Sequence, residues 1–131
     1  MDLKKIKQYA DIVKQEDAGL DRRIIAKVVG VTFEGRQEIL AKISDDTLVR
    51  LERDRRNKYD YYAVKVMAKT GDGWEQAGFL PRTMSPLVAR SLDQGVKLSA
   101  SVFRVLGGFE LDDEGGGTAH IGLEIRITPE R

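Results

Sequence analysis

The chain has 131 residues, of which 41% are hydrophobic and 33% charged, and its formal net charge is +1. This length suits one domain that can bury a core, and no apolar run approaches the roughly 20 residues that span a membrane. The sequence has no cysteine and one histidine, which excludes disulfides, thiolate metal sites and multi-histidine metal centres. We therefore expect a cytoplasmic protein that uses no metal or other cofactor.

Residues 3–16 carry apolar side chains at helical spacing with lysine and glutamine between them, which predicts an amphipathic helix. Asp2 suits the N-cap, and Gly19 lies just beyond the expected end. The segment lacks the continuous apolar stretch of a signal peptide. We assign residues 1–18 to this helix and residues 19–131 to a barrel domain. The pattern leaves open whether the helix packs on that domain or contacts another chain, as in a homodimer.

The spacing of apolar residues changes after the predicted N-terminal helix. Residues 24–33 (IIAKVVGVTF) form a β-branched, nearly continuous apolar run, which predicts a buried strand. Gly30 inside this run indicates a bulge or a sharp bend. We expect residues 36–43 to form a short helical turn and residues 48–53 to form a second strand.

The second half of the chain contains four more strand patterns. Residues 63–68 and 74–80 alternate around a Thr-Gly-Asp-Gly hairpin signal at 70–73. Residues 84–92 have helical spacing before Gly95, and two further strands are expected at 96–106 and 119–127. The fold class is therefore mainly β (α+β): a small OB-like barrel of about six strands with one inserted helix and an N-terminal helix.

Known catalytic patterns are missing from the sequence. There is no phosphate-binding loop and no dinucleotide fingerprint after a strand. The serines lack a nucleophile-elbow context, and His120 is the only histidine that could act as a base. The acid pairs and runs, such as 112–114, do not follow calcium-loop spacing. We therefore predict a protein that is not an enzyme.

The turn at residues 55–62 (RRNKYDYY) combines three tyrosines with an amide, an acid and several cations. Flat aromatic faces beside cations are what proteins use to stack an unpaired base and hold its phosphate. Residues 50–58 hold five cations and two acids, which indicates a basic patch on a nearly neutral body. The alternative remains open that the tyrosines cover the barrel edge, that Asp60 is only a turn residue, and that the charges are solvated.

Four segments taken together resemble the HIRAN domain family. The most specific is N-x-Y-D-x-x-A-V-x-V at 57–66, followed by G-F-L-P at 78–81; the others are 28–33 and 49–54. The resemblance covers residues 24–127. It implies an OB-like barrel that binds single-stranded DNA and, in helicase-associated members, captures a free 3′ end. A helicase or nuclease is then a candidate partner, and DNA repair a candidate role.

The resemblance also implies roles for individual residues. Tyr59 would stack on a terminal base, Asp60 would accept a hydrogen bond from the 3′-hydroxyl, and Arg82 would contact a phosphate. From the residues themselves, the arginines at 53, 55 and 56 are candidate phosphate contacts, because a solvated side chain loses little on docking. The predicted nucleic-acid-binding set is Phe33, Arg53, Arg55, Arg56, Asn57, Tyr59, Asp60, Tyr62, Phe79 and Arg82.

The sequence departs from the helicase-type pattern at several positions. Those members carry an arginine and a second aromatic around Thr32 and Glu34, and an acid at Glu34 would repel a phosphate. Lys58 replaces the usual proline, and Tyr62 the usual asparagine. Because stacking contributes ~1–3 kcal/mol per base, these departures predict weaker DNA binding. The alternative function is a protein-interaction or scaffolding domain with a degenerate DNA site, which assembles through its N-terminal helix.

Overall fold

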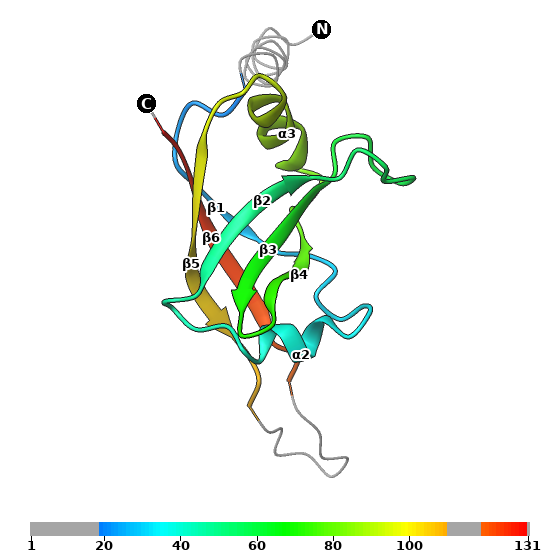
Figure 1. Cartoon of the computed structure of the whole chain (residues 1–131), viewed down its shortest axis with the longest axis vertical. Coiled ribbons are helices and arrows are strands. Elements are labelled where there is room, and N and C mark those ends of the chain that lie inside the picture. The colour runs from blue at the N-terminus through cyan, green and yellow to red at the C-terminus, as the bar shows by residue number, and fades with distance from the viewer. Residues whose placement is uncertain (1–18, 110–118, 131) are drawn as a thin grey trace, which may run out of the picture.

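The computed structural model describes residues 19–109 and 119–130, and it contains one six-stranded antiparallel sheet in the order β1-β6-β5-β2-β3-β4 (Figure 1). The strands are β1 (Ile24–Lys27), β2 (Leu48–Arg53), β3 (Val64–Thr70), β4 (Gly73–Phe79), β5 (Leu98–Leu106) and β6 (Gly122–Pro129), and the helices are α2 (Arg36–Leu40) and α3 (Ser85–Asp93). The predicted mainly β, OB-like fold with six strands is confirmed. The helix expected at residues 3–16 lies outside the described residues.

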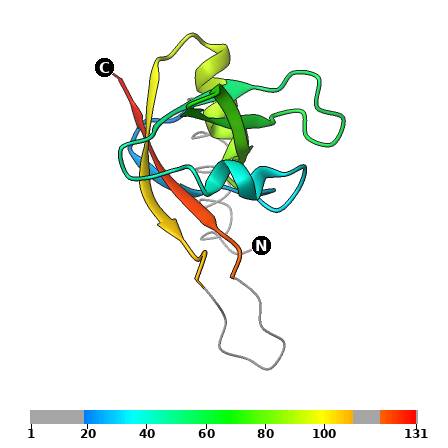
Figure 2. The same ribbon diagram turned by 60° about the horizontal axis from the view of Figure 1, so that its bottom comes forward.

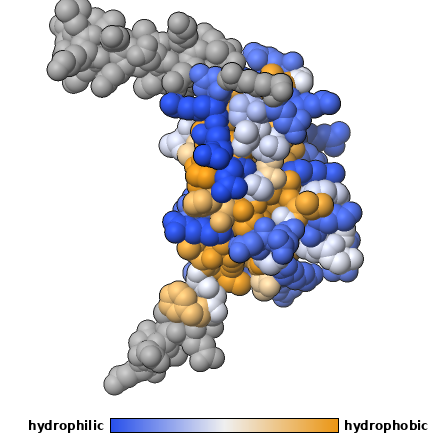
Figure 3. Space-filling model, turned by 90° about the vertical axis from the view of Figure 1, so that its left-hand side faces the viewer, coloured by the Kyte–Doolittle hydropathy of each residue, from blue (hydrophilic) through white to orange (hydrophobic). Residues whose placement is uncertain are grey.

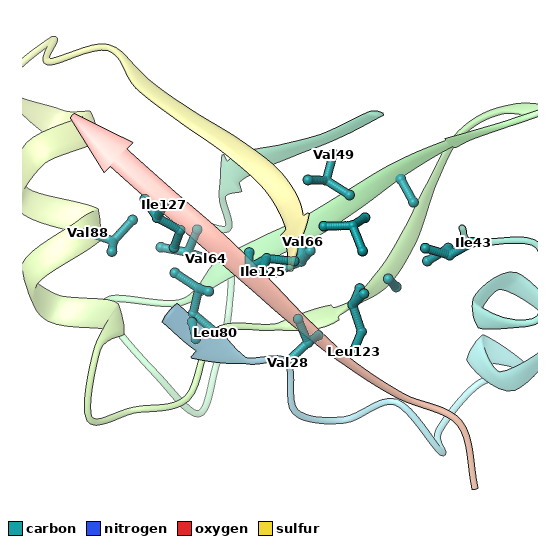
Figure 4. Close-up of a cluster of buried hydrophobic side chains, with 14 of the residues drawn as sticks. Val28, Ile43, Val49, Val64, Val66, Leu80, Val88, Leu123, Ile125 and Ile127 are labelled. Carbon is teal, nitrogen blue, oxygen red and sulfur yellow. The ribbon is translucent and has the colours of Figure 1, made fainter. Parts of the chain in front are cut away.

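The core lies on the inner side of the curved sheet. Three alternate residues of β3 and three of β6 are fully buried, as the two-residue period of a strand predicts: Val64, Val66 and Ala68, and Leu123, Ile125 and Ile127. Figure 4 shows these side chains converging with Val28, Val49 and Leu80, and with Val88 from α3. Ile43, just after α2, fills the other end of the same cluster. The outer side of β3 and β4 is therefore available for contacts.

The sheet is not closed into a continuous barrel, and Val29, two residues beyond the edge strand β1, forms one isolated bridge with Phe79 at the end of the other edge strand, β4. Val29 and Phe79 exchange two backbone hydrogen bonds of 2.8 and 2.9 Å. A Cβ added to Gly78 would lie 2.4 Å from the carbonyl oxygen of Val29, so only glycine allows this approach. The strand expected at 24–33 is correspondingly shorter, because the chain leaves β1 after Lys27 and turns at Gly30, whose φ is 72°.

The two helices cover opposite ends of the barrel (Figures 1 and 2). The predicted inserted helix is present as α3, with Pro86 in its first turn, where proline is tolerated. The helical turn expected near residue 36 is α2, which packs beside β4. None of the helices in the described part of the chain is long and apolar enough to cross a membrane.

Candidate nucleic-acid interface

The loop between β2 and β3 is organised by Asn57. Its Oδ1 accepts hydrogen bonds from the backbone N–H groups of Tyr59 and Asp60, both at 2.9 Å. Its Nδ2 donates to a carboxylate oxygen of Asp54 at 3.2 Å. This is the local turn bonding that asparagine favours. It leaves the side chain of Tyr59 projecting into solvent, 85% exposed.

Asp60 and Arg82 fasten this loop to the start of α3. Oδ1 of Asp60 accepts from the N–H of Tyr62 at 2.9 Å, and Oδ2 accepts from the hydroxyl of the buried Ser85 at 3.2 Å. The guanidinium of Arg82 donates to the carbonyl oxygen of Tyr59 at 2.7 Å. The backbone of Tyr59 is thus held by Arg82, which precedes α3, and the carboxylate of Asp60 by Ser85, the first residue of that helix.

The second loop, residues 30–35, is folded around the buried guanidinium of Arg36. Arg36 donates to the carbonyl oxygen of Gly30 at 2.8 Å and to Glu34 at 3.2 Å. Its guanidinium carbon lies 5.2 Å from the centroid of the Phe79 ring, which is cation–π distance. With Arg36 occupied inside the loop, Phe33 points outward and is 66% exposed.

Two adjoining cavities of about 230 and 620 Å³ lie between these loops, which project on the same side of the molecule in Figures 1 and 2. The smaller cavity is lined by Val29, Asn57, Tyr59, Asp60, Ala63, Phe79, Leu80 and Arg82. The larger is lined by Phe33, Glu34, Arg36, Asp54, Asn57, Tyr59, Lys65, Gln76 and Phe79. Because Asn57, Tyr59 and Phe79 line both, the cavities form one surface, called the groove from here on.

The groove is balanced in charge and rich in aromatic surface. Three cations and three acids line it: Arg36, Lys65 and Arg82, and Glu34, Asp54 and Asp60. A surface without net charge does not attract phosphate over long distances. Its aromatic faces and mixed donors and acceptors suit the contact of a planar, uncharged group such as a base.

Six of the ten predicted residues line the groove: Phe33, Asn57, Tyr59, Asp60, Phe79 and Arg82. The structure does not bring the others into it. Lys65 and Gln76 also line the groove, but the sequence analysis did not include them in the predicted binding set. Both lie on strands, where alternation is the available signal. Lys65 sits between the fully buried Val64 and Val66 of β3, so strand alternation alone places it on the outer side.

The three predicted arginines differ in how their charge is used. The side chain of Arg53 is only 9% exposed, and it donates to Asp93 at 3.0 Å and to the carbonyl oxygen of Ala63 at 2.9 Å. Arg55 also contacts Asp93, at 2.7 Å, while Arg56 is exposed and has no ion pair within the described part of the chain. The hydrogen bond from Arg53 is the main reason that the pKa of Asp93 is lowered.

Tyr62 faces away from the groove. Its ring packs against the core, and the Arg90 guanidinium lies 5.3 Å from the ring centroid. Its hydroxyl accepts a hydrogen bond from Arg90 at 3.1 Å. These contacts join the loop to α3, so the packed position of Tyr62 gives it a structural role in the unbound protein.

The curved sheet, the helix at one end and the aromatic groove between two loops define a small OB-like binding module. The sequence profile of the HIRAN domain matches residues 22–107, and the chain therefore belongs to the HIRAN domain family. The predicted family is confirmed. No protein matches this chain in the comparison with curated proteins.

Two solved structures are similar to this one. The HIRAN domain of human HLTF has 22% sequence identity and a TM-score of 0.56, and the match covers 82% of this chain and 74% of that one. A protein from Lactobacillus plantarum has 23% identity and a TM-score of 0.56, with 81% of this chain and 92% of that chain covered. At these identities the two matches establish the shared fold.

Proposed function

We propose that this protein binds single-stranded DNA at a free 3′ end, without catalysis, and that the groove is the binding site. HIRAN domains are DNA-binding modules, so membership of the family supports nucleic-acid binding in general. The observation that carries the finer proposal is the shared position of Tyr59, Asp60 and Phe79 in one cavity with Arg82 beside them.

Tyr59 is the stacking residue in this proposal. Its ring is 85% exposed, while its backbone is fixed by Asn57 and Arg82. Because the backbone that carries the ring is already fixed, only the side chain has to be ordered when a base stacks on it. Phe79 provides an apolar floor below, and the exposed Phe33 at the far end of the groove provides a further stacking surface.

Asp60 would recognise the end of the strand. A carboxylate offers about four lone-pair positions, and two hydrogen bonds to Asp60 come from Tyr62 and Ser85. The remaining positions can accept a hydrogen bond from a terminal hydroxyl, whereas a terminal phosphate would be repelled. This is the physical basis for a preference for an unblocked 3′ end.

The phosphate contacts are assigned to cations that the fold leaves accessible. Arg82, Arg56 and Lys65 have no ion pair with a described residue and lie in or near the groove. Arg53 is assigned instead a positioning role, because its guanidinium is occupied by Asp93 and by two backbone carbonyls. A cytoplasmic location, a role in DNA repair and a helicase or nuclease partner stay predictions from the sequence.

The test compares a labelled single strand that ends in a 3′-hydroxyl with the same strand ending in a 3′-phosphate, by fluorescence anisotropy at two salt concentrations. We expect tighter binding of the hydroxyl end, and a loss of that preference in Asp60→Asn. Thermal unfolding of the variant is the control, because Asp60 also supports the loop. Equal affinity for both ends would reject end recognition, and no binding of either strand would reject the function.

A protein-interaction module is the second candidate, because a different part of the surface exposes apolar side chains. Leu48 and Phe103, on the adjacent strands β2 and β5, are 65% and 42% exposed. Figure 3 shows apolar residues gathered in the middle of the side of the molecule where β5 lies. Sedimentation velocity at increasing concentration, with and without residues 1–18, would distinguish helix-mediated self-association from a monomer.

A further inference from the structure

The outer face of β3 and β4 continues from the groove along both strands. Lys65, Met67 and Lys69 alternate on β3 with residues that are fully buried. Their cross-strand partners on β4 are Phe79, Gln76 and Trp74 respectively. The pair Lys65–Phe79 lies in the groove, and the pair Lys69–Trp74 lies at the hairpin end of the same face. The distance between the two pairs along the strand is about 13 Å.

Trp74 lies at the far end of this face between two cations. The guanidinium carbon of Arg50 lies 4.4 Å from the ring centroid, and the ammonium nitrogen of Lys69 lies 5.6 Å from it. Arg50 belongs to β2, where it is the cross-strand partner of Met67. Trp74, Arg50 and Lys69 are called the Trp74 site from here on.

The charge along this face favours an anion. Lys65 and Lys69 have no ion pair within the described residues, and the exposed contact of Arg50 with Glu52 is long, at 3.8 Å. An exposed pair of this kind holds its cation weakly. The acids of the nearby hairpin, Asp72 and Glu75, lie 3.2 and 3.7 Å from Lys42, which offsets their charge.

We propose that a single strand held at its 3′ end in the groove continues across β3 and β4, and that the Trp74 site is a second subsite that stacks one of its bases and contacts its phosphates. This inference rests on the function proposed above. The continuity of the face with the groove selects the occupant: Phe79 lies in the groove, and Trp74 is the next aromatic residue along β4 for a DNA strand that leaves the groove over this face. Bases stack on tryptophan regardless of sequence. Arg50 and Lys69, which lie over the ring in the unbound protein, would be displaced by the base and neutralise its phosphates.

The experiment uses the intrinsic fluorescence of the protein, because Trp74 is its single tryptophan. The full chain is titrated with two oligonucleotides that share the same 3′-terminal sequence, one of three and one of about ten nucleotides, and anisotropy is measured in parallel. We expect both to bind, but only the longer one to quench Trp74, with about tenfold higher affinity if one additional base is stacked.

Two variants separate the subsite from the fold. Trp74→Ala should reduce the affinity for the longer strand about tenfold and leave the affinity for the trinucleotide unchanged. Because the ring is half-buried and its loss could affect folding, the surface variant Arg50→Ala/Lys69→Ala is tested beside it. A plot of the logarithm of the binding constant against the logarithm of the salt concentration has a slope that reports the number of phosphate contacts. Losing two of these contacts should reduce the magnitude of that slope by about 1.4 for the longer strand.

The control is a second aromatic–arginine cluster on another part of the sheet, in which Arg104 is also ion-paired with Glu124. Phe103 on β5 lies between Arg104 and Arg126, whose guanidinium carbons are 5.7 and 5.4 Å from its ring centroid. The variant Arg104→Ala/Arg126→Ala removes the same charge as the double variant at the Trp74 site. We expect it to leave the difference between the two oligonucleotides unchanged.

The outcomes separate this inference from the function on which it rests. If neither oligonucleotide binds, the proposed function fails. If both bind with equal affinity and Trp74 fluorescence does not change, the groove binds DNA and the second subsite is rejected. If the longer strand binds more tightly but both double variants weaken it equally, the extra affinity comes from overall charge, and the subsite is again rejected.

Discussion

The two ends of the groove are built differently. At one end, the backbone N–H groups of Tyr59 and Asp60 donate to Asn57, Arg82 donates to the carbonyl oxygen of Tyr59, and Ser85 donates to the Asp60 carboxylate. The backbone of Tyr59 and the carboxylate of Asp60 are therefore fixed before any ligand binds. At the other end, Phe33 stands on a loop where Glu34 has a φ of 54° and the cation, Arg36, is turned inward.

This difference indicates which end would dominate binding. Groups that are already ordered contribute more binding energy than groups that must be ordered by the ligand. The Tyr59 end also exposes a cation, Arg82, while at the Phe33 end the exposed carboxylate of Glu34 offsets the charge of the half-buried Lys65. We therefore expect the 3′ end to be held at the Tyr59 end, with the Phe33 end as an auxiliary contact.

The largest effect, on the stability of the whole fold, is expected from a substitution beneath the groove that affects both of its ends. Gly78→Ala would place a Cβ 2.4 Å from the Val29 carbonyl oxygen, at the isolated bridge between Val29 and Phe79. We expect a loss of ~1–3 kcal/mol or more in the free energy of unfolding. Gly71→Ala is the control, since a Cβ there meets no atom within 4 Å. Urea unfolding compares the two, and an equal effect would contradict the role of this close approach.

Truncating the two exposed aromatics compares the ends directly. Tyr59→Ala should weaken binding of a short 3′-hydroxyl strand by ~1–3 kcal/mol, because a stacked base loses its partner. Phe33→Ala should weaken it less. Both side chains are exposed, at 85% and 66%, so neither change should alter the melting temperature appreciably. Anisotropy titrations of the two variants show which substitution weakens DNA binding more. A larger loss of affinity in Phe33→Ala would contradict the conclusion that the Tyr59 end dominates binding.

Removing the support from α3 tests preorganisation at the Tyr59 end. Ser85→Ala deletes the hydrogen bond to Oδ2 of Asp60 while the carboxylate itself remains. We expect a cost of ~0.5–1.5 kcal/mol in stability and a lower preference for the hydroxyl end over the phosphate end. The buried Ser91→Ala, whose hydroxyl accepts from the N–H of Leu20, is the matched control. An unchanged end preference in Ser85→Ala would show that this support is not needed.

Neutralising Glu34 should improve the weaker end. Glu34→Gln keeps the size of the side chain and removes the acid that faces the groove. We expect DNA affinity to rise by ~0.2–1 kcal/mol, the range of an exposed charge contact, with the largest gain at low salt. Glu38→Gln, an exposed acid of α2 outside the cavities, serves as control. An equal gain in the control would assign the effect to net charge.

The smallest effect concerns pH. The pKa of Asp93 is lowered, first by its hydrogen bond from Arg53, so the associated stability is present above the usual aspartate pKa and is lost as pH falls through the folded value. The wild type should therefore lose slightly more stability between pH 5 and pH 3 than Asp93→Asn does. Urea midpoints at both pH values measure this difference, and identical losses would contradict the linkage.

Much of the fold follows from local patterns in the sequence. Alternating apolar residues predicted β3 and, with only partial alternation, β2. The Thr-Gly-Asp-Gly segment predicted the hairpin between β3 and β4, and helical spacing after Pro81 predicted α3. The bridge between Val29 and Phe79 could not be predicted in this way, because it pairs residues that lie far apart in the chain. The end of β1 was also missed, because the chain leaves the strand after Lys27, before this bridge and the turn at Gly30.

The site was predictable in part. The aromatic and acidic residues of the groove have a recognisable motif, and the hydrogen bonds of Asn57 and Asp60 explain it. The roles of the arginines could not be predicted, because Asp93, which occupies Arg53 and Arg55, comes from the end of a helix some 40 residues away. Ion pairs between residues far apart in the sequence cannot be recognised from local patterns. The folded structure is needed to show which arginines remain accessible to a ligand.

The most direct test of the central claim is a ¹⁵N-resolved NMR titration of the full chain with a short single strand ending in a 3′-hydroxyl. The structure predicts saturable shifts of the backbone signals of Tyr59, Asp60, Phe79 and Arg82, with smaller ones around Phe33. Shifts confined to Leu48 and Phe103, or no saturable shifts, would contradict the assignment of the groove as the DNA-binding site.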